Sequence, residues 1–325
     1  MDLHFLIDNL TNPALLFFIF GILAVRLKSD LEIPPSSAKF ISLYLLFSIG
    51  FKGGQELSHS DFAPEIFWAL FAGILLALTV PLYTFFILRR KFNVSNAGAI
   101  AASYGSVSAV TFVTAISFLE MEQISFGGHM VAVMALMEAP SIIIGVLLMA
   151  LFRPQRNEKL QLGTLVRHSL TNGSVLLILG SLVIGYLESE EQAQGIEPFT
   201  TDIFKGFLAV FLLDMGITAG RKITALLDKG GFPFVFAILV PTFNGCAVAI
   251  LSGLFMDSTG DRFLLSILAA SASYIAVPAA MRIAAPDANP SLYLPMALAI
   301  TFPFNITLGM PLYMTVVEVW QWYAA

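Results

Sequence analysis

The chain contains ten apolar stretches that are each about long enough to cross a lipid bilayer as a helix. A span needs roughly 20 mostly apolar residues, and it must be helical because the lipid interior offers backbone groups no other hydrogen-bond partner. Charged residues make up only 12% of the sequence, against about a quarter in soluble proteins. We therefore expect an all-α polytopic membrane protein. Its predicted transmembrane helices are 10–27, 35–57, 62–89, 95–118, 127–152, 169–187, 200–222, 231–256, 262–284 and 292–320.

The basic residues predict how these spans are oriented. Cytoplasmic connections of membrane proteins are enriched in Lys and Arg, and most of the 17 basic residues lie in connections that follow odd-numbered spans. Lys52, Lys205 and Arg262 are the exceptions. Both termini are therefore expected on the outer side. The net charge of −5 gives no indication of nucleic-acid binding, and the single cysteine, Cys246, offers neither a disulfide framework nor a cysteine metal cluster.

The number of spans and a set of matching glycines both favour an internal repeat. Five spans in each half force the two halves to insert in opposite orientations, which is the plan of many secondary transporters. Gly50 and Gly54 in the second span match Gly216 and Gly220 in the seventh at one constant offset. We expect two inverted five-helix repeats joined by a cytoplasmic linker. The first repeat, the linker and the second repeat are residues 1–152, 153–168 and 169–325.

The fourth and ninth spans both contain poor helix formers near their middle. Gly105 lowers helix propensity, and Pro278 lacks an amide donor and clashes with the carbonyl four residues earlier. Helices broken here would place amino ends with free N–H groups deep in the membrane, which suits a small anion. Pro278 would fit the first position of its half-helix. Alternatively, the small residues only allow close helix packing. The candidate substrate-binding residues are Gly105, Ser106, Val107, Ser108, Ser271, Ser273, Tyr274 and Ala276.

Glu138 is an ionisable residue near the middle of the fifth span, and Pro140 follows it closely. A charge at this depth is costly unless it is paired or solvated, so such residues are functional candidates. Glu138 could bind a coupling cation such as Na⁺ or carry a proton, or it could be a structural partner for a neighbouring helix. Asn305 could satisfy carbonyls freed by a nearby proline. Lys52 and Asp214 lie on corresponding spans and could pair with each other.

Several short motifs lie in or beside the fourth, fifth, ninth and tenth spans. They are Gly105-Ser106-Val107-Ser108 with Thr111, Glu138-Ala139-Pro140, Ala269-Ala270-Ser271, Ser273, Pro278 followed by Arg282, and Ala288-Asn289-Pro290-Ser291 with Tyr293. In these motifs the chain resembles the sodium-dependent bicarbonate transporter family of bacterial permeases. The resemblance runs over nearly the whole length of the sequence.

This resemblance implies ten helices in two inverted repeats, with a transport core formed by spans 3–5 and 8–10 and a gate domain formed by the others. It implies import of bicarbonate with Na⁺ by alternating access, a homotrimer in the bacterial plasma membrane, and a cytosolic PII-like regulator as a partner. No cofactor is expected other than Na⁺ as the coupling ion. The residues assigned to this ion are Ser108, Thr111, Glu138 and Asn305.

The ninth span departs from the family pattern at four positions, where Ala272, Tyr274, Ala276 and Val277 replace a serine, an acid, a serine and a glycine. The family reads Ser-Ser-Ser-Asp-Ile-Ser-Gly-Pro, whereas this chain has Tyr274 in place of the acid. The leading hypothesis is Na⁺-coupled import of a small anion, with bicarbonate as the substrate. Tyr274 and Phe302 favour the alternative of a less polar organic anion or metabolite, coupled to H⁺. An ion channel is less favoured because the repeat lies within one chain. An enzyme is not expected because neither HExxH nor GxSxG occurs.

Overall fold

The computed structural model describes residues 11–59, 64–152, 167, 171, 173–227 and 230–324. The regular structure of these residues is helical, and none of them lies in a strand. The predicted linker, 153–168, lies outside the described residues except for Arg167. The helices are α2 (Pro13–Arg26), α3 (Pro35–Ser58), α4 (Pro64–Leu88), α5 (Val94–Gly105), α6 (Ala109–Met121), α7 (His129–Phe152), α9 (Gly173–Leu187), α10 (Glu190–Gln194), α11 (Phe204–Leu227), α12 (Gly231–Leu251), α13 (Thr259–Ala270), α14 (Ala276–Ala284), α15 (Pro290–Pro295), α16 (Phe302–Phe304) and α17 (Met310–Ala324). Short π-helical or 3₁₀ segments are η1 (Pro198–Asp202), η2 (Ser252–Leu254), η3 (Met296–Thr301) and η4 (Asn305–Gly309).

Six helical segments are long and apolar enough to cross a membrane. They are Pro64–Leu88, Val94–Met121, His129–Phe152, Pro198–Ile223, Gly231–Leu254 and Pro290–Gln321. Two shorter apolar helices, α2 and α9, overlap the predicted first and sixth spans, and α3 and α13–α14 overlap the second and ninth. The chain is therefore a multi-pass helical membrane protein. That all ten segments cross the bilayer stays a prediction.

Large apolar side chains on the outer faces of several helices are exposed. Phe17 and Phe20 on α2, and Phe67 and Phe71 on α4, are between 45% and 65% exposed. Soluble monomers rarely expose contiguous apolar patches of this kind. Lipid is the solvent that such faces require.

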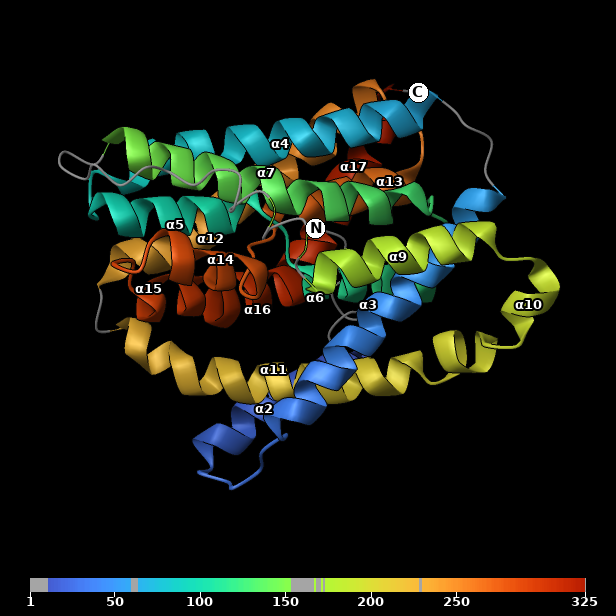
Figure 1. The fold of residues 1–325 in the computed structure, drawn as a ribbon, viewed down its shortest axis with the longest axis horizontal. Helices are drawn as coiled ribbons and strands as arrows, with labels where there is room; N and C mark the ends of the chain where they lie inside the picture. Colours follow the sequence, from blue (N-terminus) through green and yellow to red (C-terminus); the bar gives the residue numbers. More distant parts are fainter. Residues whose placement is uncertain are drawn as a thin grey trace.

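The fold consists of two crossed helix pairs and two larger helix groups (Figure 1). Helix α2 packs along α11, and α3 packs along α9. Helix α4 packs on α5 and α7, and α12 packs on α13 and α17. Figure 1 shows α2 crossing α11 at the lower edge of the view and α4 with α7 at the upper edge. Each crossed pair therefore joins a helix from the first half of the chain to a helix from the second half.

Glycines allow the two crossed pairs to approach closely. A Cβ atom on Gly216 would lie 2.1 Å from the Phe18 carbonyl oxygen of α2, and a Cβ atom on Gly54 would lie 2.1 Å from the Leu182 carbonyl oxygen of α9. Gly185 on α9 meets the carbonyl oxygen of Phe51 at the same 2.1 Å. Any larger residue would force these backbones apart. The matching glycines in the sequence therefore lie at helix crossings.

The prediction that Lys52 pairs with Asp214 is wrong. The Lys52 Nζ atom lies 3.1 Å from Glu120 Oε1, at the carboxyl end of α6. Helix α3 contacts α6 at this end. The second carboxylate oxygen of Glu120 lies 4.0 Å from Lys205 Nζ on α11. Packing of α3 against α6 determines this ion pair. The position of Lys52 along its own helix does not reveal that packing.

Candidate functional site

Two helices are interrupted at the predicted positions. Helix α5 ends at Gly105 and α6 begins at Ala109, while α13 ends at Ala270 and α14 begins at Ala276. The residue after each first half is a serine with extended backbone, at φ −84° and ψ 177° for Ser106 and at φ −83° and ψ 169° for Ser271. These two serines therefore end the helical path in the same way.

Local sequence explains where the half-helices end and begin. Gly105, the last residue of α5, lowers helix propensity, and packing also favours glycine there because an added Cβ atom would lie 2.2 Å from Pro81 Cγ of α4. The Ser108 side chain accepts a hydrogen bond from the Thr111 N–H at 3.2 Å and caps α6. Pro278 is the third residue of α14 rather than the first. Its missing N–H still costs nothing there, because the first-turn donors of a helix have no intrahelical acceptor.

The two interruptions contact each other directly. The Ser273 N–H donates to the Ser103 carbonyl oxygen at 2.8 Å, and the Ser103 hydroxyl donates to the Ser273 carbonyl oxygen. The Ser108 N–H donates to Ser271 Oγ at 3.1 Å, and the Ser271 hydroxyl donates to the Leu268 carbonyl oxygen at 3.0 Å. Backbone groups released by one break are thus satisfied by the other, as buried polar groups in a membrane protein require.

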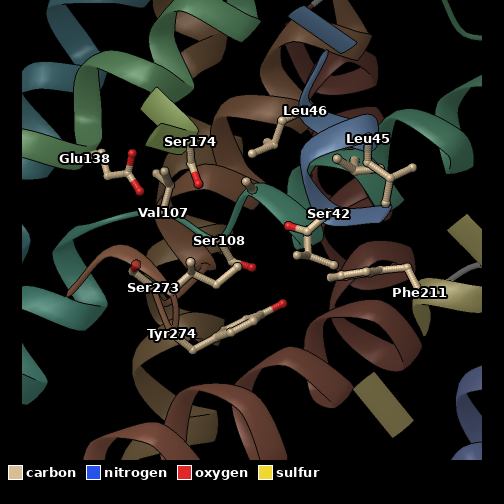
Figure 2. A pocket seen from close by; sticks show the side chains of 14 residues that line it. Ser42, Leu45, Leu46, Val107, Ser108, Glu138, Ser174, Phe211, Ser273 and Tyr274 are labelled. Atoms are coloured by element: carbon tan, nitrogen blue, oxygen red, sulfur yellow. The ribbon is translucent and has the colours of Figure 1, made fainter. Parts of the chain in front are cut away.

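A small cavity lies beside this crossing (Figure 2). Its volume is about 30 Å³. A water molecule needs about 10–15 Å³ by the same measure, so the cavity holds about two waters or a solute of a few heavy atoms. The polar residues that line it are Ser42, Ser108, Glu138, Ser174, Ser273 and Tyr274. The larger apolar residues that line it are Leu45, Leu46, Val107, Val110, Val113, Phe211 and Ile275.

Five of the predicted site residues line this cavity together, and they come from both interruptions and from α7. They are Val107, Ser108, Glu138, Ser273 and Tyr274. Figure 2 shows Glu138 and Ser174 on one side of the space and Phe211 on the opposite side. Three further lining residues were not predicted from the sequence: Ser42 on α3, Ser174 on α9 and Phe211 on α11. In the sequence they are only hydroxyl or aromatic residues within apolar spans. That pattern does not reveal which face of each helix lines the cavity.

The other predicted substrate residues are buried next to the cavity. Gly105 packs against Pro81, and Ser271 is hydrogen-bonded within the crossing. Ala276 is the buried first residue of α14. Ser106 is fully buried, and its hydroxyl has no hydrogen-bond partner among the described residues.

Two of the predicted ion ligands, Thr111 and Asn305, do not line the cavity. Thr111 is buried in the first turn of α6 and donates its N–H to Ser108. The Asn305 amide nitrogen donates to the Ala270 carbonyl oxygen at 2.8 Å, and its oxygen accepts from the Tyr313 hydroxyl at 3.1 Å. Asn305 therefore satisfies a carbonyl at the end of α13, which is the structural alternative considered for it.

The cavity combines a helix amino end with a carboxyl group. Ala109 and Val110, the first residues of α6, line it, and first-turn N–H groups give a helix a partial positive charge. Glu138 lines the same space, and the described lining contains no Lys, Arg or His. Such a site can hold a small anion at the helix end and a cation or proton at Glu138.

Two interrupted helices that meet inside a multi-pass helical protein, around a cavity with one carboxyl group, define a membrane transporter. The sequence profile of the Na⁺-dependent bicarbonate transporter superfamily matches residues 13–318, and the chain belongs to this family. Among curated proteins, none matches the chain. Family membership makes it a transport protein rather than an enzyme.

Proposed function

We propose that this protein is a secondary transporter that imports a small, singly charged anion together with a cation. The observation that carries the proposal is the cavity at the crossing of the two interruptions, where the amino end of α6 and Glu138 share one space. Bicarbonate and Na⁺ form the pair to test first, because the family is described by them. Tyr274 and the largely apolar lining favour a second candidate substrate, a less polar organic anion.

Coupling to a cation follows from the charges in the cavity. An anion at the amino end of α6 would lie close to the Glu138 carboxylate. Two like charges about 5 Å apart repel by about 3 kcal/mol at an effective dielectric constant of about 20. The described lining offers no basic side chain to offset this repulsion. A Na⁺ ion bound by Glu138 and Ser108, or a proton on Glu138, removes it.

The predicted ion ligands divide by position. Glu138 and Ser108 line the cavity, and Thr111 lies in the first turn of α6 beside Ser108. We assign these three to the coupling ion. Asn305 is left out because both ends of its amide are engaged by Ala270 and Tyr313.

The way in which helices of one half of the chain pack on helices of the other half supports ten spans in two inverted repeats. In this arrangement the first repeat is α2, α3, α4, α5–α6 and α7, and the second is α9, α11, α12, α13–α14 and α15–α17. The first helix of each repeat packs on the second helix of the other, as α2 on α11 and α9 on α3. The third helix of each packs on its interrupted neighbour, as α4 on α5 and α12 on α13. An internal twofold relation accounts for both observations.

We place the protein in the bacterial plasma membrane as a homotrimer with both termini outside.

Uptake of labelled bicarbonate into proteoliposomes tests the function. An inward Na⁺ gradient should drive accumulation by the wild-type protein. Glu138→Gln should reduce Na⁺-driven uptake at least about tenfold, because the cation loses its charged ligand. Glu191→Gln, at an exposed residue of α10, is the matched control and should behave as wild type. Undiminished Na⁺-driven uptake by Glu138→Gln would contradict the role assigned to this residue.

A further inference from the structure

Tyr274 presents a polar group that the described part of the protein leaves unsatisfied. Its side chain is 9% exposed and lines the cavity. Figure 2 shows the ring extending into the space between Ser108 and Phe211. The Ser108 side chain lies near the hydroxyl, but no described residue partners it with good hydrogen-bond geometry. A buried phenol normally finds a partner because leaving it unpaired is costly. An acceptor on a bound solute would supply that partner.

The interruptions and α6 line the cavity with hydroxyls as well as apolar side chains, whereas α3 and α11 line it almost entirely with apolar ones. The interruptions contribute the hydroxyls of Ser108 and Ser273, next to the amino end of α6. Helices α3 and α11 contribute Leu45, Leu46 and Phe211, with Ser42 as the exception. A solute that fills this space should therefore carry acceptor oxygens at one end and an apolar group at the other.

Size restricts the solute further. A cavity of about 30 Å³ holds about two water molecules, and drug-sized pockets are at least about ten times larger. This volume favours a solute of a few heavy atoms, about the size of acetate. Dicarboxylates and aromatic acids are too large.

These observations point to one substrate class. Resting on the proposed function, we infer that the site takes short-chain monocarboxylates of the size of acetate in preference to bicarbonate, and that Tyr274 determines this preference. One carboxylate oxygen accepts from the amino end of α6, and the other accepts from the Tyr274 hydroxyl. The methyl group lies against Leu45, Leu46 and Phe211.

Bicarbonate has nearly the same shape as acetate, with a hydroxyl in place of the methyl group. That hydroxyl would face the wall that Leu45, Leu46 and Phe211 form, where Ser42 is the one polar side chain that the described parts of α3 and α11 offer. Its hydrogen bonds would be only partly satisfied there, which weakens binding. The lost hydrogen bond corresponds to a preference for acetate of about tenfold. Ser42 is the residue of this wall able to partner such a hydroxyl, so Ser42→Ala should widen the preference.

The test compares four probes, formate, acetate, propionate and bicarbonate, in proteoliposomes under inward Na⁺ and H⁺ gradients. Labelled acetate uptake should be inhibited by unlabelled acetate at about one tenth of the concentration at which bicarbonate inhibits it. Tyr274→Phe should raise the acetate concentration for half-maximal uptake about tenfold. The melting temperature of this variant should not fall, since the ring remains and only an unpaired hydroxyl is lost. Tyr186→Phe, at an exposed residue of α9, is the control and should match wild type.

Two results would overturn the inference. One is uptake of bicarbonate with no inhibition by any monocarboxylate, which leaves the proposed function intact and removes only the substrate class. The other is unchanged acetate uptake by Tyr274→Phe, which removes the role of the phenol. Failure of all four anions to enter under either gradient would instead refute the proposed function, and the inference with it.

Discussion

Replacing Gly185 with alanine should separate α3 from α9, one of the two crossed pairs that join the halves of the chain. The new Cβ atom would lie 2.1 Å from the Phe51 carbonyl oxygen and 2.9 Å from its carbon, whereas ordinary contact begins at 3.4 Å. The helices would have to move apart by about 1.3 Å, the difference between 3.4 and 2.1 Å. Because the opposing atoms belong to the backbone, no side-chain rotation can relieve the overlap.

Two opposing effects set the magnitude of this change. Overpacking a close contact costs about 1–3 kcal/mol, and a rigid backbone neighbour favours the upper end of that range. Alanine gains about 1 kcal/mol over glycine in helix propensity. The net loss of stability should therefore be about 2 kcal/mol. Gly180 lies on the same helix with nothing within 4 Å of its added Cβ, so Gly180→Ala gains the propensity without the overlap.

Thermal unfolding of the purified protein in one detergent measures this difference. Gly185→Ala should melt several degrees below wild type, and Gly180→Ala should melt at or slightly above it. Equal melting temperatures for the two variants would refute the close approach of α3 and α9.

Two further predictions concern Asn305 and the membrane topology. Asn305→Ala should lower the free energy of unfolding by about 1–3 kcal/mol, because the Ala270 carbonyl and the Tyr313 hydroxyl lose their partner. The Na⁺ concentration for half-maximal uptake should stay unchanged. A changed Na⁺ dependence with an unchanged melting temperature would instead show that Asn305 is an ion ligand. The predicted topology places Gln192 outside and Arg90 in the cytoplasm. In a Cys246→Ala background, a membrane-impermeant maleimide should therefore label Gln192→Cys in intact cells and Arg90→Cys only after permeabilisation. Labelling of both from one side would contradict the inverted repeat.

The breaks in the two interrupted helices were predictable from sequence because their causes are local. Gly105 lowers helix propensity, Ser108 caps the helix that it precedes, and Pro278 is tolerated within a first helical turn. Such residues act on their own backbone, so a single sequence reveals them. The helix ends agree with the predicted spans to within a few residues for the same reason.

The composition of the cavity was only partly predictable because it depends on packing between distant segments. Helices α3, α9 and α11 pack over the contact between the two interruptions, and only this packing brings Ser42, Ser174 and Phe211 to the site. The pairing of Lys52 with Glu120 depends on the same packing. Periodicity along one helix identifies an apolar face, but it does not identify which neighbour that face meets.

An experimental structure of the protein in lipid with a bound small anion tests the central claim most directly. We predict density in the cavity beside Ser108 and Tyr274, within hydrogen-bond distance of the Tyr274 hydroxyl and of a first-turn N–H of α6. Continuous helix through residues 106–108 and 271–275, or an anion bound only elsewhere while this cavity stays empty, would contradict the account.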